Sequence, residues 1–330
     1  MRLPAPNGPL SDRLVTALGR PPRSTVQLVR PVGGDHADDT LSLWILHELH
    51  YRGFDDVDER WEWAPALASV RHHLEQELEQ RLRTDFAAYL DAQGLSEAVR
   101  TEGGTSDDFI DLLIELVEKH DGPSLADHLL REGTPEHACQ LLRQRSIYHL
   151  KEADPTSWVV PRTNGRVKAA LMEIQFDEYG AGHSDRVHQD LFAKGLSATG
   201  LSADYGRYVG EARPSILEQN NAGSLFGLHR RLRGAALGHL AAFEATSSLP
   251  SRTLARALRR LGLPEEIAAY YDEHVEADAV HEQLALRDIC GALVQDEPHL
   301  REDVVFGAWA CLELEARTAR DLLHQWDAAS

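Results

Sequence analysis

The chain has 330 residues, of which 42% are hydrophobic and 26% charged, so it can bury the sizeable core of a globular protein. Its formal net charge of −19 argues against nucleic acids and anionic membranes as partners, because both repel an acidic surface. The three cysteines, Cys139, Cys290 and Cys311, are far apart, which argues against a disulfide framework and favours a reducing compartment. No apolar run approaches the roughly 20 residues of a membrane span, and the first residues lack the apolar stretch of a signal peptide, so a cytoplasmic location is expected.

The first part of the chain, residues 1–35, is rich in Pro, Gly and Arg. Pro21 and Pro22 are adjacent, and Gly33 and Gly34 follow soon after. Such clusters interrupt regular structure, so a loosely ordered lead-in is expected, with a short extended piece at 25–28.

Helical periodicity dominates from Asp38 onward. Asp38, Asp39 and Thr40 are suited to cap a helix that carries Leu41 and Trp44 on one face. Further helices are expected at 65–90, from 107 onward, and at 123–131, 135–152, 165–180, 184–199, 214–229, 231–248, 253–262, 264–294 and 300–326.

Turn residues separate most of these helices, and neither a ladder of strands nor a fixed repeat is visible. The predicted fold class is therefore all-α, with a bundle-like core. We divide the chain into the lead-in at 1–35, an N-terminal helical extension at 36–134 and a core at 135–330.

The strongest local pattern is the string HVEADAVH, from His274 to His281. Because a helix advances roughly 100° per residue, Asp278 lies about 40° from His274 around the axis, and His281 about 20° away in the other sense. Two imidazoles and a carboxylate on one narrow stripe match the ligand set of a non-haem iron site. A solvated charged face explains this stripe poorly, because Val275, Ala277, Ala279, Val280 and Leu284 make the helix largely apolar.

Three glutamates lie in apolar helical surroundings elsewhere in the chain: Glu152, Glu178 and Glu244. A buried carboxylate is costly unless it has a cation or a hydrogen-bond partner, and a metal cluster at the bundle axis is a common partner for several of them. Each glutamate alone has a plainer explanation, such as a bond to a nearby hydroxyl group or to turn backbone. His188 follows Glu178 by ten residues, about 80° away on an uninterrupted helix, so a kink at Gly180 and Gly182 is needed to bring the two together.

Together these residues resemble the ligand pattern of the haem-oxygenase-like di-iron oxidases. The order and spacing are similar to that family, closest to its nitrosourea-forming N-oxygenase branch, over roughly residues 38–327. Strings such as LMEIQFDEYGAG and FEATSSLP are similar to proteins known as the iron-containing redox enzyme family. The resemblance implies seven metal ligands: Glu152, Glu178, His188, Glu244, His274, Asp278 and His281.

The resemblance also implies a fold and an activity. The fold would be a seven-helix haem-oxygenase-like core with an N-terminal helical extension. The protein would be an oxidase or oxygenase that holds two iron ions, takes O2 as co-substrate and acts by N-oxygenation, desaturation or oxidative C–C cleavage on an amino or fatty acid. A small-molecule substrate and an electron donor are the expected partners, and a homodimer is the expected assembly.

Two alternatives stay open. One is an iron-binding, ferritin-like protein without oxygenase chemistry. The other is a metal-free relative of the thiaminase or pyrroloquinoline-quinone-synthase type.

Several neighbouring side chains compete for roles at this site. His183 is an alternative to His188, which we favour because His183 lies in the glycine-rich turn. Glu173 and His149 are candidates to support the ligands Glu178 and Glu152 by hydrogen bonds. Other histidines are interpreted as packing or surface residues: His47, His50 and His239.

Overall fold

The computed structural model describes residues 1–22, 34–100 and 105–329, without the side chains of residues 276–280 and 329. In this part of the chain the regular elements are all helices and there is no strand, which confirms the predicted all-α class. None of the helices in the described ranges is both long and apolar enough to cross a membrane. The extended piece predicted at 25–28 lies outside the described residues.

The lead-in contains a helix, α1 (Pro9–Leu18), so the prediction that residues 1–35 are loosely ordered is wrong for this segment. Leu10, Leu14 and Leu18 are spaced by four residues and are fully buried. The Asp38 carboxylate accepts hydrogen bonds from the backbone N–H groups of Leu10 (2.7 Å) and Ser11 (2.8 Å). Asp38 therefore serves the free N–H groups of α1, not those of its own helix as predicted.

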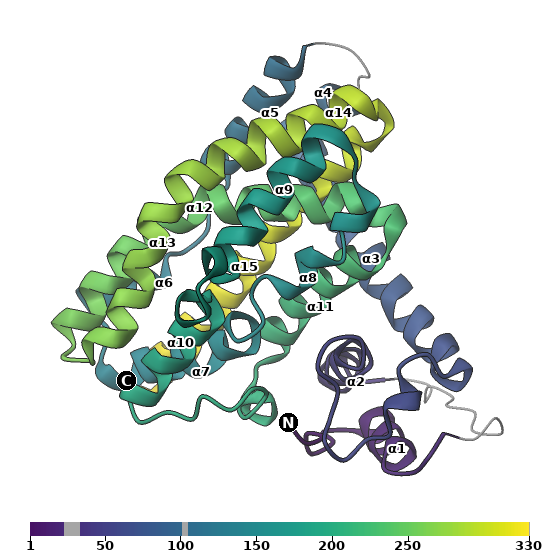
Figure 1. Cartoon of the computed structure of the whole chain (residues 1–330), viewed down its shortest axis with the longest axis vertical. Coiled ribbons are helices and arrows are strands. Elements are labelled where there is room, and N and C mark those ends of the chain that lie inside the picture. The colour runs from purple at the N-terminus through teal and green to yellow at the C-terminus, as the bar shows by residue number, and fades with distance from the viewer. Residues whose placement is uncertain (23–33, 101–104, 330) are drawn as a thin grey trace.

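The N-terminal layer continues with four helices, drawn in dark purple to blue in Figure 1. Their bounds are α2 (His36–Glu48), α3 (Pro65–Gln93), α4 (Ser96–Arg100) and α5 (Ser106–Lys119). Helix α2 is buried on nearly all sides, because α1, α3 and α11 pack around it. The N-terminal layer is thus packed against the rest of the molecule through the contact of α2 with α11.

The remaining helices form the bundle in which the long α12 packs against α13 on one side and α15 on the other (Figure 1). Their bounds are α6 (Leu125–Arg131), α7 (Pro135–His149), α8 (Asp154–Ser157), α9 (Gly165–Glu178), α10 (His188–Ala198), α11 (Pro214–Leu228), α12 (Arg233–Arg260), α13 (Glu265–Gln283), α14 (Ala292–Asp296) and α15 (Arg301–Ala329). Helices α12 and α15 approach closely because glycines face the partner backbone. A Cβ atom on Gly238 would lie 1.9 Å from the carbonyl oxygen of Val304.

Two segments differ from the predicted helix boundaries. Pro250 was expected to separate helices at 231–248 and 253–262, but α12 runs through it. One missing backbone hydrogen bond is tolerated there because Leu254 and Leu258 beyond the proline are buried in the core. The single helix expected at 264–294 is instead interrupted by a π-helical stretch, Leu284–Gly291, of a kind that often lies next to functional sites.

The hydrophobic core does not follow the predicted division of the chain. One cluster of buried side chains extends from Leu10 to Leu314 and includes residues of both the N-terminal layer and the bundle. A second cluster joins α6, α7 and α10 to the ends of α12, α13 and α15. The boundary between 36–134 and 135–330 stays a prediction.

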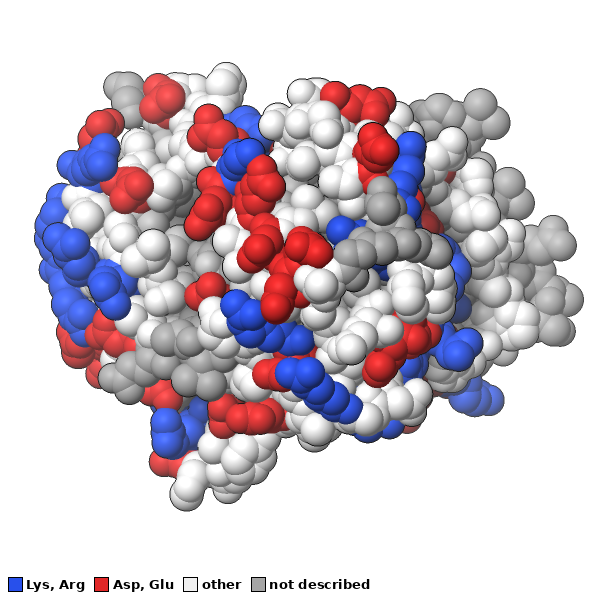
Figure 2. Space-filling model, turned by 90° about the horizontal axis from the view of Figure 1, so that it is seen from above, with Lys and Arg blue, Asp and Glu red and all other residues white. Residues whose placement is uncertain are grey.

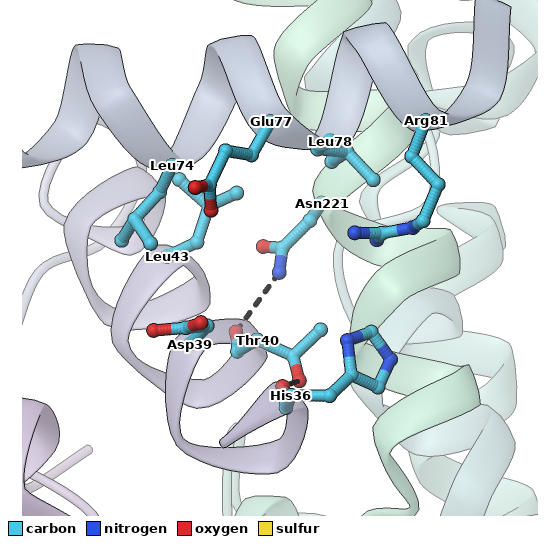
Figure 3. Close-up of a pocket in the computed structure, with 9 residues that line it drawn as sticks. All are labelled: His36, Asp39, Thr40, Leu43, Leu74, Glu77, Leu78, Arg81 and Asn221. Atoms are coloured by element: carbon cyan, nitrogen blue, oxygen red, sulfur yellow. Dashed lines mark hydrogen bonds between the residues drawn. The ribbon is translucent and has the colours of Figure 1, made fainter. Parts of the chain in front are cut away.

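Polar groups lie between α2, α3 and α11, where they line a hollow of about 320 Å³ (Figure 3). Asn221 donates a hydrogen bond to the carbonyl oxygen of Thr40 (2.9 Å) across it. Two of its lining residues also contact Glu218: His36 Nε2 lies 3.1 Å and Arg81 Nη2 3.0 Å from the carboxylate. Burial opposes ionisation of Glu218, but these two neighbours outweigh it and hold its pKa at about 2.

The surface charge is uneven on the face that Figure 2 shows. Acidic side chains gather near the middle of this face, while a group of basic side chains lies toward one edge. The net charge of −19 is therefore not spread evenly over this face.

Candidate metal centre

Six of the seven predicted ligands converge inside the bundle. Glu152 lies in the turn after α7, Glu178 is the last residue of α9 and His188 is the first of α10. Glu244 comes from the middle of α12, and His274 and His281 from α13. All six side chains are buried, with exposed fractions of 8% or less. The seventh, Asp278, belongs to α13, but its side chain lies outside the described residues.

The six residues form two groups of potential ligand atoms. Glu152, His188 and His274 make the first triad, and their nitrogen and oxygen atoms lie within 4.8 Å of one another. Glu178, Glu244 and His281 make the second triad by the same measure. The triads adjoin, because His188 Nδ1 of the first lies 3.1 Å from Glu178 Oε2 of the second.

The close contacts within the triads do not have the geometry of hydrogen bonds. His274 Nε2 is 3.6 Å from Glu152 Oε1, and His281 Nδ1 is 3.4 Å from Glu244 Oε2. These two nitrogens and His188 Nδ1 are buried and have no hydrogen-bond partner among the described residues. Buried polar atoms are almost always paired, so several unpaired nitrogens aimed at carboxylates fit a shared cation.

Without a bound cation, the negative charge of the triad carboxylates favours the protonated form of the histidines beside them. Burial alone would lower the pKa of both α13 histidines, but their carboxylate neighbours reverse this effect. The pKa of His274 rises to about 10 beside Glu152, and that of His281 to about 9 beside Glu244. Metal ligation requires neutral imidazole, so a bound cation would displace these protons.

Neighbouring groups fix the orientation of the α13 histidines. The second ring nitrogen of His274, Nδ1, lies 2.9 Å from the carbonyl oxygen of Tyr270, and His281 Nε2 lies 3.1 Å from Asp177 Oδ2. The Tyr270 hydroxyl group also donates to both oxygens of Glu152, at 3.2 and 3.0 Å. Such partners are typical of metal-binding histidines and carboxylates.

Sequence reasoning missed Tyr270 and Asp177. Tyr270 lies one helical turn before His274, a spacing that indicates contact on the same face. The expectation for Glu173 was wrong, because its side chain is exposed. Asp177 occupies the supporting position instead.

The other competitors are also placed. His183 is exposed at the turn, whereas His188 is buried in the first triad. His149 lies 3.6 Å from Glu152 without a hydrogen bond, so the predicted supporting bond is not formed. Burial alone lowers the pKa of His239 to about 4, and its ring lines a cavity beside α11.

The segment between Glu178 and His188 is a complete helix break instead of the predicted kink. Two short 3₁₀ turns, Gly180–Gly182 and Ser184–Arg186, separate α9 from α10. Gly180 has a φ of +82°, and a Cβ atom there would lie 2.8 Å from the backbone nitrogen of Val187. This tight reversal is what allows the end of one helix and the start of the next to face the same point.

In the described residues, the chain is a helical bundle whose paired, buried Glu and His triads are compatible with metal binding. The chain belongs to the family of iron-containing redox enzymes, whose sequence model matches residues 139–316, more than half of the chain. All seven predicted ligands fall within this range. No curated protein sequence matches the chain.

Two crystal structures of a CADD-like protein of unknown function from Nostoc punctiforme PCC 73102 are similar to the fold. Their TM-scores are 0.52 and 0.51 at 16% and 15% sequence identity. The alignments cover 67% and 68% of this chain and 97% of the Nostoc chain in both cases. The similarity supports the predicted helical-bundle core and leaves about a third of the present chain as additional structure.

Proposed function

We propose that the chain is a non-haem di-iron oxidase or oxygenase that uses O2 to oxidise a small organic substrate. The observation that carries this proposal is the pair of adjoining, buried Glu and His triads. Family membership supports iron-dependent redox chemistry in general, and the two triads favour two ions over one.

Each triad would hold one iron ion. Glu152, His188 and His274 would bind the first, while Glu178, Glu244 and His281 would bind the second. Glu178 would hold its ion close to the first site, since its Oε2 lies 3.1 Å from His188 Nδ1 of the first triad. When bound, the two ions supply the sites at which O2 is taken up and reduced.

The charges of the site agree with this stoichiometry. The three glutamates of the triads and Asp278, the fourth predicted carboxylate, would together carry four negative charges. Two Fe(II) ions offset four such charges, which a single divalent ion does not. Burial of the triads keeps bulk water away from the ligand atoms, and Tyr270 and Asp177 hold the ligands Glu152 and His281 in place.

The type of oxidation is also part of the proposal. N-oxygenation, desaturation or oxidative C–C cleavage of an amino or fatty acid follows from the resemblance of the ligand pattern. An electron donor, a homodimeric assembly and a cytoplasmic location complete the proposal.

An anaerobic Fe(II) titration tests the proposal, with saturation expected near two ions per chain. His281→Ala should lose tight iron binding, and His183→Ala, in an exposed position on the neighbouring turn, is the matched control. Saturation followed by no O2 consumption would favour the iron-handling alternative. A protein that binds no iron would favour the metal-free alternative.

A further inference from the structure

A cavity lies beside the candidate metal centre, and none of the seven predicted ligands lines it. It contains about 510 Å³ of empty space, counting its open mouth, and is narrow. Its walls come from α7, α8, α11 and α12, and its lining includes Tyr148, Phe243 and His239.

The cavity lies next to the triads. Phe243 precedes the ligand Glu244 on α12, and the ring of Tyr148 packs edge-on against it at 5.6 Å between centroids. Tyr148 lines the cavity, and its ring packs edge-on against that of His149, which in turn lies 3.6 Å from the ligand Glu152 of the first triad.

The lining is mostly apolar, and its one cation is already paired. Arg145 donates two hydrogen bonds to Glu315, one of them at 2.9 Å, and Gln219 donates a third at 3.0 Å. The pair has no net charge to offer a ligand. A carboxylate or ammonium group placed here would lose its hydration without gaining a counter-charge from the lining.

Two buried polar atoms in the wall lack a partner among the described residues: Asn220 Oδ1 and His239 Nε2. The amide nitrogen of Asn220 donates to the carbonyl oxygen of Ile216 (2.9 Å), which leaves its oxygen as a free acceptor. Asn220 is only 6% exposed, so bulk water does not readily satisfy that oxygen. A ligand that donates a hydrogen bond would satisfy it, and a carboxylate would not.

We infer that this cavity binds an uncharged, slender and largely apolar molecule that carries a hydrogen-bond donor, such as a hydroxyl group or an amide N–H. This inference rests on the proposed function, for which the molecule is the substrate class. It narrows the substrate of that proposal to a neutral aliphatic compound, in place of the carboxylate of a fatty acid or the zwitterion of an amino acid.

Gly223 provides a direct way to block the cavity. It lines the wall on α11, and a Cβ atom there would meet nothing within 4 Å. Gly223→Ala should therefore add a methyl group without a clash and favour the helix, and Gly223→Leu extends further into the cavity. Gly210→Leu, also in open space but outside this cavity, is the matched control.

The test is calorimetric titration of the full chain with four probes that share one alkyl chain: 1-octanol, octanoate, octylamine and 2-aminooctanoate. We expect 1-octanol to bind at least about tenfold more tightly than the three charged probes. Gly223→Leu should weaken 1-octanol at least about tenfold, and Asn220→Ala about two- to tenfold through the lost acceptor. Gly210→Leu should leave the affinity unchanged.

Three results would overturn the inference. One is that no probe binds. Another is that a charged probe binds as tightly as 1-octanol. The third is that neither Gly223 variant changes the affinity for 1-octanol.

Iron titration of the same proteins separates this inference from the proposed function. Normal iron binding and O2 consumption without 1-octanol binding would refute the inference alone. Binding of 1-octanol to a wild-type chain that takes up no iron would refute the proposed function.

Discussion

Replacing Glu48 by Gln should destabilise the protein strongly, because it would leave a buried ammonium group without its counter-charge. Glu48 at the end of α2 and Lys151 in the turn after α7 are at most 1% exposed, and Lys151 Nζ lies 3.0 Å from Glu48 Oε2. The Tyr205 hydroxyl group donates to the same carboxylate oxygen at 2.7 Å. Gln keeps the shape and one acceptor, so the change removes mainly the charge.

The expected loss is about 3 kcal/mol of unfolding free energy. Breaking a buried ion pair by removing one partner typically costs about 3–5 kcal/mol. The lower end applies because the ring faces of Tyr51 and Trp44, at 4.4 and 5.7 Å from Lys151 Nζ, continue to attract the ammonium group. A loss of this size is a large share of the stability of an ordinary domain.

Urea unfolding followed by circular dichroism at neutral pH measures this loss. Glu115→Gln is the matched control, since its ion pair with Lys119 is exposed and should contribute less than about 0.5 kcal/mol. The double variant Glu48→Leu with Lys151→Met removes both charges and should recover most of the stability. The reasoning is refuted if Glu48→Gln costs no more than Glu115→Gln, or if the double variant is less stable than the single one.

Three further predictions concern the site, the acid stability and the helix boundaries. Asp177→Asn should weaken Fe(II) binding about 10–100-fold by releasing His281, as measured by competition with a chelator, while Glu173→Gln on the exposed face should not. Glu218→Gln should lower the unfolding free energy by about 2 kcal/mol at pH 7. Because the folded pKa of Glu218, about 2, lies below the ordinary 4.5, the difference in unfolding free energy from wild type should shrink as the pH falls from 4.5 toward 2. Urea unfolding at several pH values measures this difference, and a pH-independent difference would contradict the reasoning. Pro250→Ala should raise the unfolding free energy by about 1–3 kcal/mol by restoring a hydrogen bond inside α12, and an unchanged urea midpoint would show that the helix has no missing bond there.

The helices were predictable where the periodic apolar face is long and bounded by clear turn residues. Helix α11 begins at Pro214 as predicted and ends within one residue of the expected position. The failures have tertiary causes. Helix α1 forms because Asp38, from another helix, satisfies its first N–H groups, and α12 continues through Pro250 because the residues beyond it are buried.

The candidate ligands could be found from the sequence better than their surroundings could. His274 and His281 share a face by helical arithmetic alone, so their proximity needed no tertiary information. Which acidic residue supports them depends on how α9 is rotated against α13. Glu173 and Glu178 are five residues apart, about 140° around the helix, so they cannot both face the centre, whereas Asp177 at the helix end reaches His281.

The N-terminal layer supports the candidate metal centre although it supplies none of the predicted ligands. Lys151, which Glu48 of α2 holds in the interior, immediately precedes the ligand Glu152. Glu152 lies in a turn and not in a helix, so its position depends on contacts made by its neighbours and not on a rigid backbone ladder. The buried ion pair and the Tyr270 hydroxyl group therefore both fix this turn, one from the N-terminal layer and one from α13. The hydrophobic cluster that the N-terminal layer shares with the bundle connects the whole layer to this turn. The position of Glu152 in the first triad therefore depends on the bundle and on its N-terminal extension together.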